Sequence, residues 1–255
     1  MVLTRTIPCL LVDEHQLVKT VRFKKPKYVG DPVNAIKIYN DKEVDELILL
    51  DITATQQNRG PNYDLIKSVA DECFMPVCYG GGIHSIDQIK QIFSLGIEKI
   101  SVNSALSDHP ELIAEAAGIF GSQSIVASLD IRRSILGKYS TYTHRGKKRI
   151  NNNVVDFAIA VGERGAGEIL LNSIDREGTW DGFDLDLIAR VTENVRTPVI
   201  AVGGAGNLQD ISDAVNGAGA SAVALGSMAV FQGKDLGVLI NFPAAHKLRN
   251  LYGSN

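Results

Sequence analysis

The motif Gly80-Gly81-Gly82 and three motifs around it occur twice in this chain, in the same order. The first half contains Leu49-Leu50-Asp51, Pro76-Val77, Gly80-Gly81-Gly82 and Asn103-Ser104-Ala105. The second half contains Leu170-Leu171-Asn172, Pro198-Val199, Gly203-Gly204-Ala205 and Gly226-Ser227-Met228. The two copies stay 121 to 123 residues apart. This period is too long for a solenoid and indicates a duplicated half-domain.

Short apolar segments alternate with amphipathic segments along the chain. The apolar segments are continuous, as strands buried on both faces of a parallel sheet are. We expect strands at 7–12, 46–52, 75–79, 97–102, 124–131, 168–172, 198–202 and 222–226. We expect helices at 63–72, 85–95, 110–120, 153–164, 184–194 and 207–216, with Ser85, Asp87 and Asn207 as candidate N-cap residues.

Eight strands that alternate with helices in 255 residues predict an α/β fold, a (β/α)8 TIM barrel. The barrel would be a single domain, with half-barrels at approximately 1–122 and 123–255. The competing architecture is a doubly wound open sheet. An open sheet does not require a twofold duplication with matched glycines, so the repeat favours the barrel.

The composition is that of an ordinary globular protein. The net charge is −3, with 45% hydrophobic and 22% charged residues, which gives no indication of nucleic-acid or membrane binding. No apolar run approaches the ~20 residues of a spanning helix. Cys9, Cys73 and Cys78 lack metal or redox spacing, so we expect reduced thiols in a cytoplasmic protein and neither a metal nor a cofactor.

Glycine-rich turns follow the predicted strands in both halves. Backbone N–H groups at a helix N-terminus bind phosphate, and glycine lets the ligand approach the backbone closely. A single such turn is more often a tight turn than a binding site, but the duplication predicts a ligand with a phosphate at each end. The predicted phosphate-binding residues are Gly82, Asn103 and Ser104 at one end, and Gly204, Gly226 and Ser227 at the other, with Glu177 and Gly178 lining the second site.

Two long basic loops, at 13–31 and 132–153, follow the first and fifth strands, and the second could form a hairpin. A solvated basic rim would explain them, but their equivalent positions favour an anionic ligand. Lys19 in the first loop is a candidate for contact with substrate phosphate or for an ordering contact, and the alternative is an ordinary surface lysine. Asp130, which ends the fifth strand, is a candidate for proton transfer, or a helix cap. At the matching end of the first strand the chain has Leu11.

The chain resembles the HisF family, the cyclase subunits of imidazole glycerol phosphate synthase, over essentially its whole length. The resemblance lies in motifs such as Gly30-Asp31-Pro32, Leu50-Asp51-Ile52-Thr53 and Ser173-Ile174-Asp175-Arg176-Glu177-Gly178-Thr179. It implies a HisH-type glutaminase on the N-terminal face of the barrel, from which ammonia passes through the core. It also implies an ammonia gate of four charged residues, Arg5, Glu46, Lys99 and Glu168. The alternative for these four is a salt-bridged plug that only stabilises the barrel.

The chain departs from the family pattern at Leu11. The family uses two aspartates for acid–base chemistry, and the matching positions here are Leu11 and Asp130. Leucine cannot transfer a proton, and further differences resemble a diverged HisF-like branch. That branch accompanies a glutaminase and an N-acetyl-sugar amidotransferase in the synthesis of acetamidino sugars for bacterial surface polysaccharides.

Three functions therefore stay open. The first is an ammonia conduit for acetamidino-sugar formation. The second is a cyclase that makes imidazole glycerol phosphate and AICAR in histidine biosynthesis. The third is a non-catalytic activator of a glutaminase.

Overall fold

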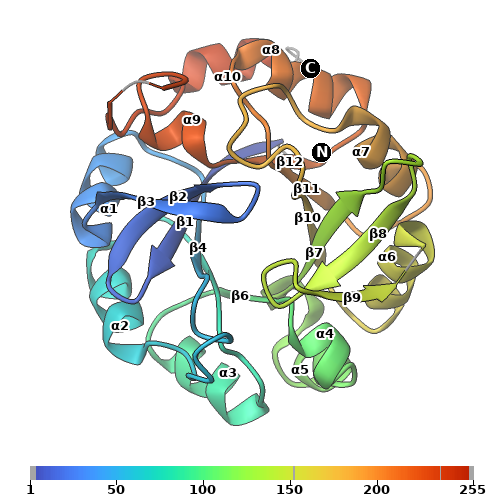
Figure 1. Ribbon diagram of the computed structural model, residues 1–255. Coiled ribbons are helices and arrows are strands. Elements are labelled where there is room, and N and C mark those ends of the chain that lie inside the picture. The colour runs from blue at the N-terminus through green and yellow to red at the C-terminus, as the bar shows by residue number, and fades with distance from the viewer. Residues whose placement is uncertain (1–3, 152, 236, 253–255) are drawn as a thin grey trace.

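Eight parallel strands close into a barrel, which confirms the predicted (β/α)8 fold (Figure 1). The computed structural model describes residues 4–151, 153–235 and 237–252. The sheet closes because β1 pairs with both β12 and β4, and β7 pairs with both β6 and β10. The barrel strands are β1 (Arg5–Asp13), β4 (Leu47–Asp51), β5 (Val77–Gly80), β6 (Lys99–Val102), β7 (Ile125–Arg133), β10 (Glu168–Ser173), β11 (Val199–Val202) and β12 (Ala222–Leu225).

The strands are apolar throughout because they bury both faces. In β1, Ile7 and Cys9 belong to a small cluster inside the barrel, whereas Leu10 and Val12 belong to a larger cluster between the barrel and its helices. Successive side chains of a strand point to opposite faces, so one strand contributes to both cores. The division into half-barrels remains a prediction.

A ring of helices surrounds the barrel (Figure 1). The six expected helices are present, and two of the candidate N-caps are confirmed: Ser85 accepts from Gln88 N, and Asn207 accepts from Gln209 N and Asp210 N. Asp87 lies in the first turn of the helix that Ser85 caps and is not itself the cap. Among the described residues no helix is long and apolar enough to span a bilayer. The helices are α1 (Pro32–Asp41), α2 (Tyr63–Glu72), α3 (Ile86–Ser94), α4 (Ala105–Asp108), α5 (Leu112–Phe120), α6 (Val154–Glu163), α7 (Leu185–Thr192), α8 (Leu208–Ser212), α9 (Ser227–Val230) and α10 (Ala245–Leu251).

Two antiparallel hairpins extend barrel strands at the mouth. The segment 13–31, expected as a loop, instead forms β2 (Gln16–Val21) and β3 (Lys24–Gly30), and β2 pairs with β1. The segment 132–153 forms β8 (Tyr139–Thr143) and β9 (Lys148–Asn151), as the sequence suggested. The hairpins lie on opposite sides of the barrel opening (Figure 1).

Candidate functional site

A cavity opens at the carboxyl ends of the barrel strands, where (β/α)8 barrels carry their active sites. The structure brings to it all the substrate and catalytic residues that the sequence predicts. These are Asp130, Lys19, Gly82, Asn103, Ser104, Glu177, Gly178, Gly204, Gly226 and Ser227, with Leu11 beside them. Of the basic residues in the two hairpins, Lys19 and Arg145 line the cavity. Most of the basic charge of these segments therefore lies outside it.

Lys19 is buried and is not a surface lysine. It is 5% exposed, and its Nζ donates to the Cys9 carbonyl, the one hydrogen-bond acceptor that it has among the described residues. A Cβ built on Gly226 would lie 3.4 Å from this Nζ. Burial lowers the pKa of Lys19, while the nearby charges of Cys9 and Glu177 act to raise it. A buried ammonium with unused donors beside the Gly226-Ser227 turn favours an anionic ligand there.

Asp130 is buried between two amide side chains and does not cap a helix. Its Oδ1 accepts from Asn172 Nδ2 at 3.0 Å, and its Oδ2 accepts from Asn103 Nδ2 at 3.3 Å. Burial raises the pKa of Asp130 from its ordinary value of 3.8 to about 7, and the hydrogen bond from Asn172 opposes this rise. A carboxyl that titrates near neutral pH is suited to proton transfer.

The structure gives two of the predicted phosphate-binding side chains other partners. The Asn103 amide donates to Asp130 and to the Ser128 carbonyl. The Glu177 carboxylate accepts from Thr20 Oγ1 and from Phe23 N, in the β2–β3 hairpin. Both residues line the cavity, but these side chains organise the site.

The glycines that follow strands β5 and β11 are required by the backbone. Gly82 has φ +70°, and a Cβ there would lie 2.7 Å from the Arg59 carbonyl oxygen. Gly204 has φ +110°, and a Cβ there would lie 2.1 Å from the Gly182 carbonyl oxygen. Each turn is therefore packed against a neighbouring loop, with only a hydrogen atom between the backbones.

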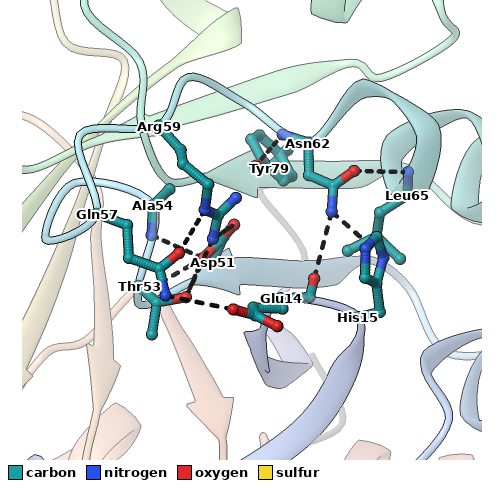
Figure 2. Close-up of polar contacts among 10 residues, drawn as sticks. All are labelled: Glu14, His15, Asp51, Thr53, Ala54, Gln57, Arg59, Asn62, Leu65 and Tyr79. Atoms are coloured by element: carbon teal, nitrogen blue, oxygen red, sulfur yellow. Dashed lines mark hydrogen bonds and ion pairs between the residues drawn. The ribbon is translucent and has the colours of Figure 1, made fainter.

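A network of polar side chains fixes one rim of the cavity (Figure 2). Asp51 Oδ1 accepts from Thr53 N, Thr53 Oγ1 and Ala54 N, while Arg59 Nη2 lies 3.4 Å from Asp51 Oδ2. Asn62 Nδ2 links this loop to the β1–β2 turn through the Glu14 carbonyl at 3.3 Å. The sequence prediction did not include Asp51 among the site residues. The signal was present, because the repeat aligns Asp51 with Asn172, which also lines the cavity.

A closed ring of ion pairs lies at the opposite end of the barrel. Arg5 pairs with Glu46 and with Glu168. Lys99 Nζ lies 3.0 Å from Glu46 Oε1 and 2.8 Å from Glu168 Oε2. The structure therefore brings together all four predicted gate residues, at the starts of their strands.

The wall between ring and mouth is divided by polarity. On the adjacent strands β6, β7 and β10 most cavity-lining side chains are polar: Ser101, Ser128, Asp130 and Asn172, with Asn103 directly after β6, whereas Val102 and Leu170 are apolar. On the adjacent strands β11, β12, β1 and β4 most are apolar: Val202, Ala224, Cys9, Leu11 and Leu50, with Asp51 as the polar residue at the end of β4. Among the described residues, the buried atoms Ser101 Oγ and Asn172 Oδ1 have no hydrogen-bond partner. Both lie on the polar side and are free to bind a small polar molecule.

Known proteins are similar in sequence to this chain over the segment that contains both the ring and the mouth. The model of the family described as "Histidine biosynthesis protein" matches residues 5–235, which include both sites. This chain belongs to the HisF family. Its relatives include the "Putative imidazole glycerol phosphate synthase subunit hisF2" of Pseudomonas aeruginosa, 52% identical over 97% of this chain and 99% of that protein. The "Imidazole glycerol phosphate synthase subunit HisF" of Streptomyces avermitilis is 44% identical over 88% of this chain and 89% of that protein.

The ring of this HisF-family chain is expected to contribute to stability. We expect Glu46→Gln to lower the free energy of unfolding by about 2 kcal/mol, because it leaves two cations with one carboxylate. Breaking a fully buried ion pair costs ~3–5 kcal/mol. The expected loss is smaller here because the side chains of Arg5 and Lys99 are 21% and 18% exposed. Urea unfolding measures the loss.

The exposed pair Lys67–Asp71 provides the matched control for this measurement. Asp71→Asn should cost less than about 0.5 kcal/mol. An equal loss from both variants would show that the ring has no special role in stability.

Proposed function

We propose that this chain is a HisF-type synthase subunit that receives ammonia from a HisH-type glutaminase and uses it at the barrel mouth. The observation that carries the proposal is the joint presence of the Arg5–Glu46–Lys99–Glu168 ring at one end and the phosphate-binding turns at the other. The polar side of the wall joins the two ends. Ser101 Oγ and Asn172 Oδ1, which have no partner among the described residues, are acceptors for ammonia N–H groups along this route.

The ligand proposed for the mouth carries two phosphates. The Gly226-Ser227 turn has the Lys19 ammonium beside it, which adds a full charge to the backbone donors. The second turn, at Gly82, Asn103 and Ser104, lines the same cavity from β5 and β6. A ligand with a phosphate at each end would span the cavity and present its centre to Asp130.

Formation of imidazole glycerol phosphate and AICAR is the reaction that the relatives' names support. In this reaction Asp130 is proposed to transfer protons, since its pKa lies near neutral pH. On the opposite strand β1 the cavity-lining residue is Leu11, which has no titratable group. Loss of one proton-transfer group typically costs ~10²–10⁴-fold in rate, so we propose slow cyclisation.

The cyclase assay with free ammonia tests this function. Purified protein and phosphoribulosyl-formimino-AICAR phosphate are mixed with an ammonium salt, and AICAR release is measured. Slow release that disappears in Asp130→Asn supports a cyclase. The absence of product above the buffer rate would exclude it.

One observation favours a second candidate, ammonia delivery for acetamidino-sugar formation. Leu11 replaces a family aspartate while all four ring residues are retained. A chain that only conducts ammonia needs the ring and not the acid–base pair, and an N-acetyl-sugar amidotransferase would complete the reaction. The test is reconstitution with glutaminase and amidotransferase. Amidine formation from glutamine that is undiminished when the barrel protein is omitted would exclude this candidate.

A further inference from the structure

The tip of the β2–β3 hairpin has an unfavourable backbone conformation. Val21 pairs with Lys24, so the turn consists of two residues, Arg22 and Phe23, with φ +53° and +64°. Two-residue turns in which both central residues have positive φ favour Asn-Gly. Most residues with a Cβ atom disfavour this region of backbone conformation, and arginine and phenylalanine are among them. The chain places an arginine and a phenylalanine there instead. A hairpin with this turn needs contacts from outside to hold it.

Those contacts come from the loop after β10. Glu177 Oε2 accepts from Phe23 N at 3.0 Å, and the Glu177 carbonyl accepts from Arg22 N at 2.9 Å. Glu177 Oε1 accepts from Thr20 Oγ1 at 2.9 Å. One glutamate therefore accepts three hydrogen bonds from three residues of the hairpin. Two of these are the backbone N–H groups of the strained turn.

The two backbones also fit closely. Gly178 has φ +72°, and a Cβ there would lie 2.3 Å from the Thr20 carbonyl oxygen. The hairpin is thus seated directly on the loop that carries Glu177. Thr20 follows Lys19, whose Nζ reaches the Cys9 carbonyl and the Gly226 turn. What fixes Thr20 therefore fixes the direction in which Lys19 enters the cavity.

We infer that Glu177 and Thr20 are positioning residues, which clamp the β2–β3 hairpin over the mouth and so hold the Lys19 ammonium at the Gly226-Ser227 turn. The inference rests on the proposed function in one respect: the placement of Lys19 is taken to serve the binding of a ligand phosphate. The clamp itself is a property of the protein without ligand. It assigns the Glu177 carboxylate to the hairpin and not to the phosphate, a contact that two negative groups would disfavour.

Lysine reactivity measures the clamp directly. Wild type, Glu177→Gln and Thr20→Val are treated briefly with an acetylating reagent, and each lysine is quantified by mass spectrometry. Lys24 and Lys25, which are exposed on the same hairpin, serve as internal standards. Glu14→Gln removes a carboxylate at the opposite end of the hairpin and is the matched control.

We expect the Lys19/Lys24 labelling ratio to rise about tenfold in Glu177→Gln, since hydrogen bonds to a charged group are stronger than those to a neutral amide. Thr20→Val removes one hydroxyl at nearly constant shape and should raise the ratio several-fold. Glu14→Gln should leave it at the wild-type value. An unchanged ratio in both clamp variants, or an equal rise in Glu14→Gln, would overturn the inference. If Glu177→Gln does not fold, the labelling ratio of Thr20→Val alone tests whether the clamp exists.

A binding measurement separates this inference from the proposed function. The chain has a single tryptophan, Trp180, which lines the cavity, so its fluorescence can follow titration with ribulose 1,5-bisphosphate as a probe. Binding to wild type that weakens about tenfold in Glu177→Gln supports the purpose of the clamp, and equal binding overturns it. If wild type does not bind the probe, the two-phosphate proposal fails, while the labelling ratio still decides whether the clamp exists.

Discussion

Leu11→Asp is expected to accelerate ammonia-dependent cyclisation by roughly 10²–10⁴-fold, the usual contribution of a proton-transfer group. Leu11 lies in the C-terminal part of β1, and Asp130 lies in the C-terminal part of β7, on the other side of the closed sheet. Both line the same cavity. An aspartate at position 11 would place one carboxyl on each side of the ligand. The rate of AICAR release with free ammonia measures the effect.

Two controls show whether the gain comes from proton transfer at this position. Leu11→Asn has nearly the shape and polarity of the aspartate but does not titrate, so it should stay near the wild-type rate. Leu50→Asp puts a carboxyl on the neighbouring strand β4, in the same cavity, and should also stay slow. A gain in either control equal to that of Leu11→Asp would mean that general polarity is responsible.

The second large effect is a dependence of stability on pH that comes from Asp130. Its pKa is about 7 in the folded protein, raised by burial from 3.8, so the folded state binds this proton more tightly than the unfolded state. The stabilising contribution of the protonated form is complete below about pH 4 and is lost as the pH rises through 7. Asp130→Asn does not titrate. Its free energy of unfolding should therefore rise relative to wild type between pH 4 and pH 7, by up to about 4 kcal/mol.

Urea unfolding at a series of pH values measures this difference. Ser128→Ala changes a neighbouring residue of the polar wall without removing a titratable group, so its difference from wild type should not depend on pH. If the difference in free energy of unfolding between Asp130→Asn and wild type is also independent of pH, the Asp130 carboxyl is ionised in the folded protein from pH 4 to pH 7. Asn172 Oδ1 has no hydrogen-bond partner among the described residues. A flip of the Asn172 side-chain amide would place this oxygen where it can accept a hydrogen bond from the protonated Asp130 carboxyl.

The barrel could be predicted because its determinants are local. Each parallel strand is a short apolar run, and α2 was predicted to the residue because an amphipathic segment stands between two turns. The capping residues Ser85 and Asn207 precede helices and accept from their first N–H groups. The positions of the site residues followed from the fold, because every strand end of a (β/α)8 barrel faces the same mouth.

The partners of the site residues could not be predicted, because they depend on contacts between distant segments. Asn103 was expected to bind phosphate, but β6 lies beside β7 and its amide reaches Asp130. The β2–β3 hairpin was missed because its turn, Arg22-Phe23, lacks the Asn or Gly that marks such turns. Helix α1 was not expected either, although Asp31 caps it and Pro32 is its first residue.

The division of the cavity wall has a stereochemical consequence. Ammonia that followed the proposed route past Ser101, Ser128 and Asn172 would arrive along one side of the mouth, beside Asp130, while Leu11, Leu50 and Val202 line the other side. A planar acceptor carbon held between the two turns would then be attacked on a single face. In an imidazole or an amidine the attacked carbon is planar again, so the barrel would select the configuration of the transient tetrahedral intermediate and not that of the product.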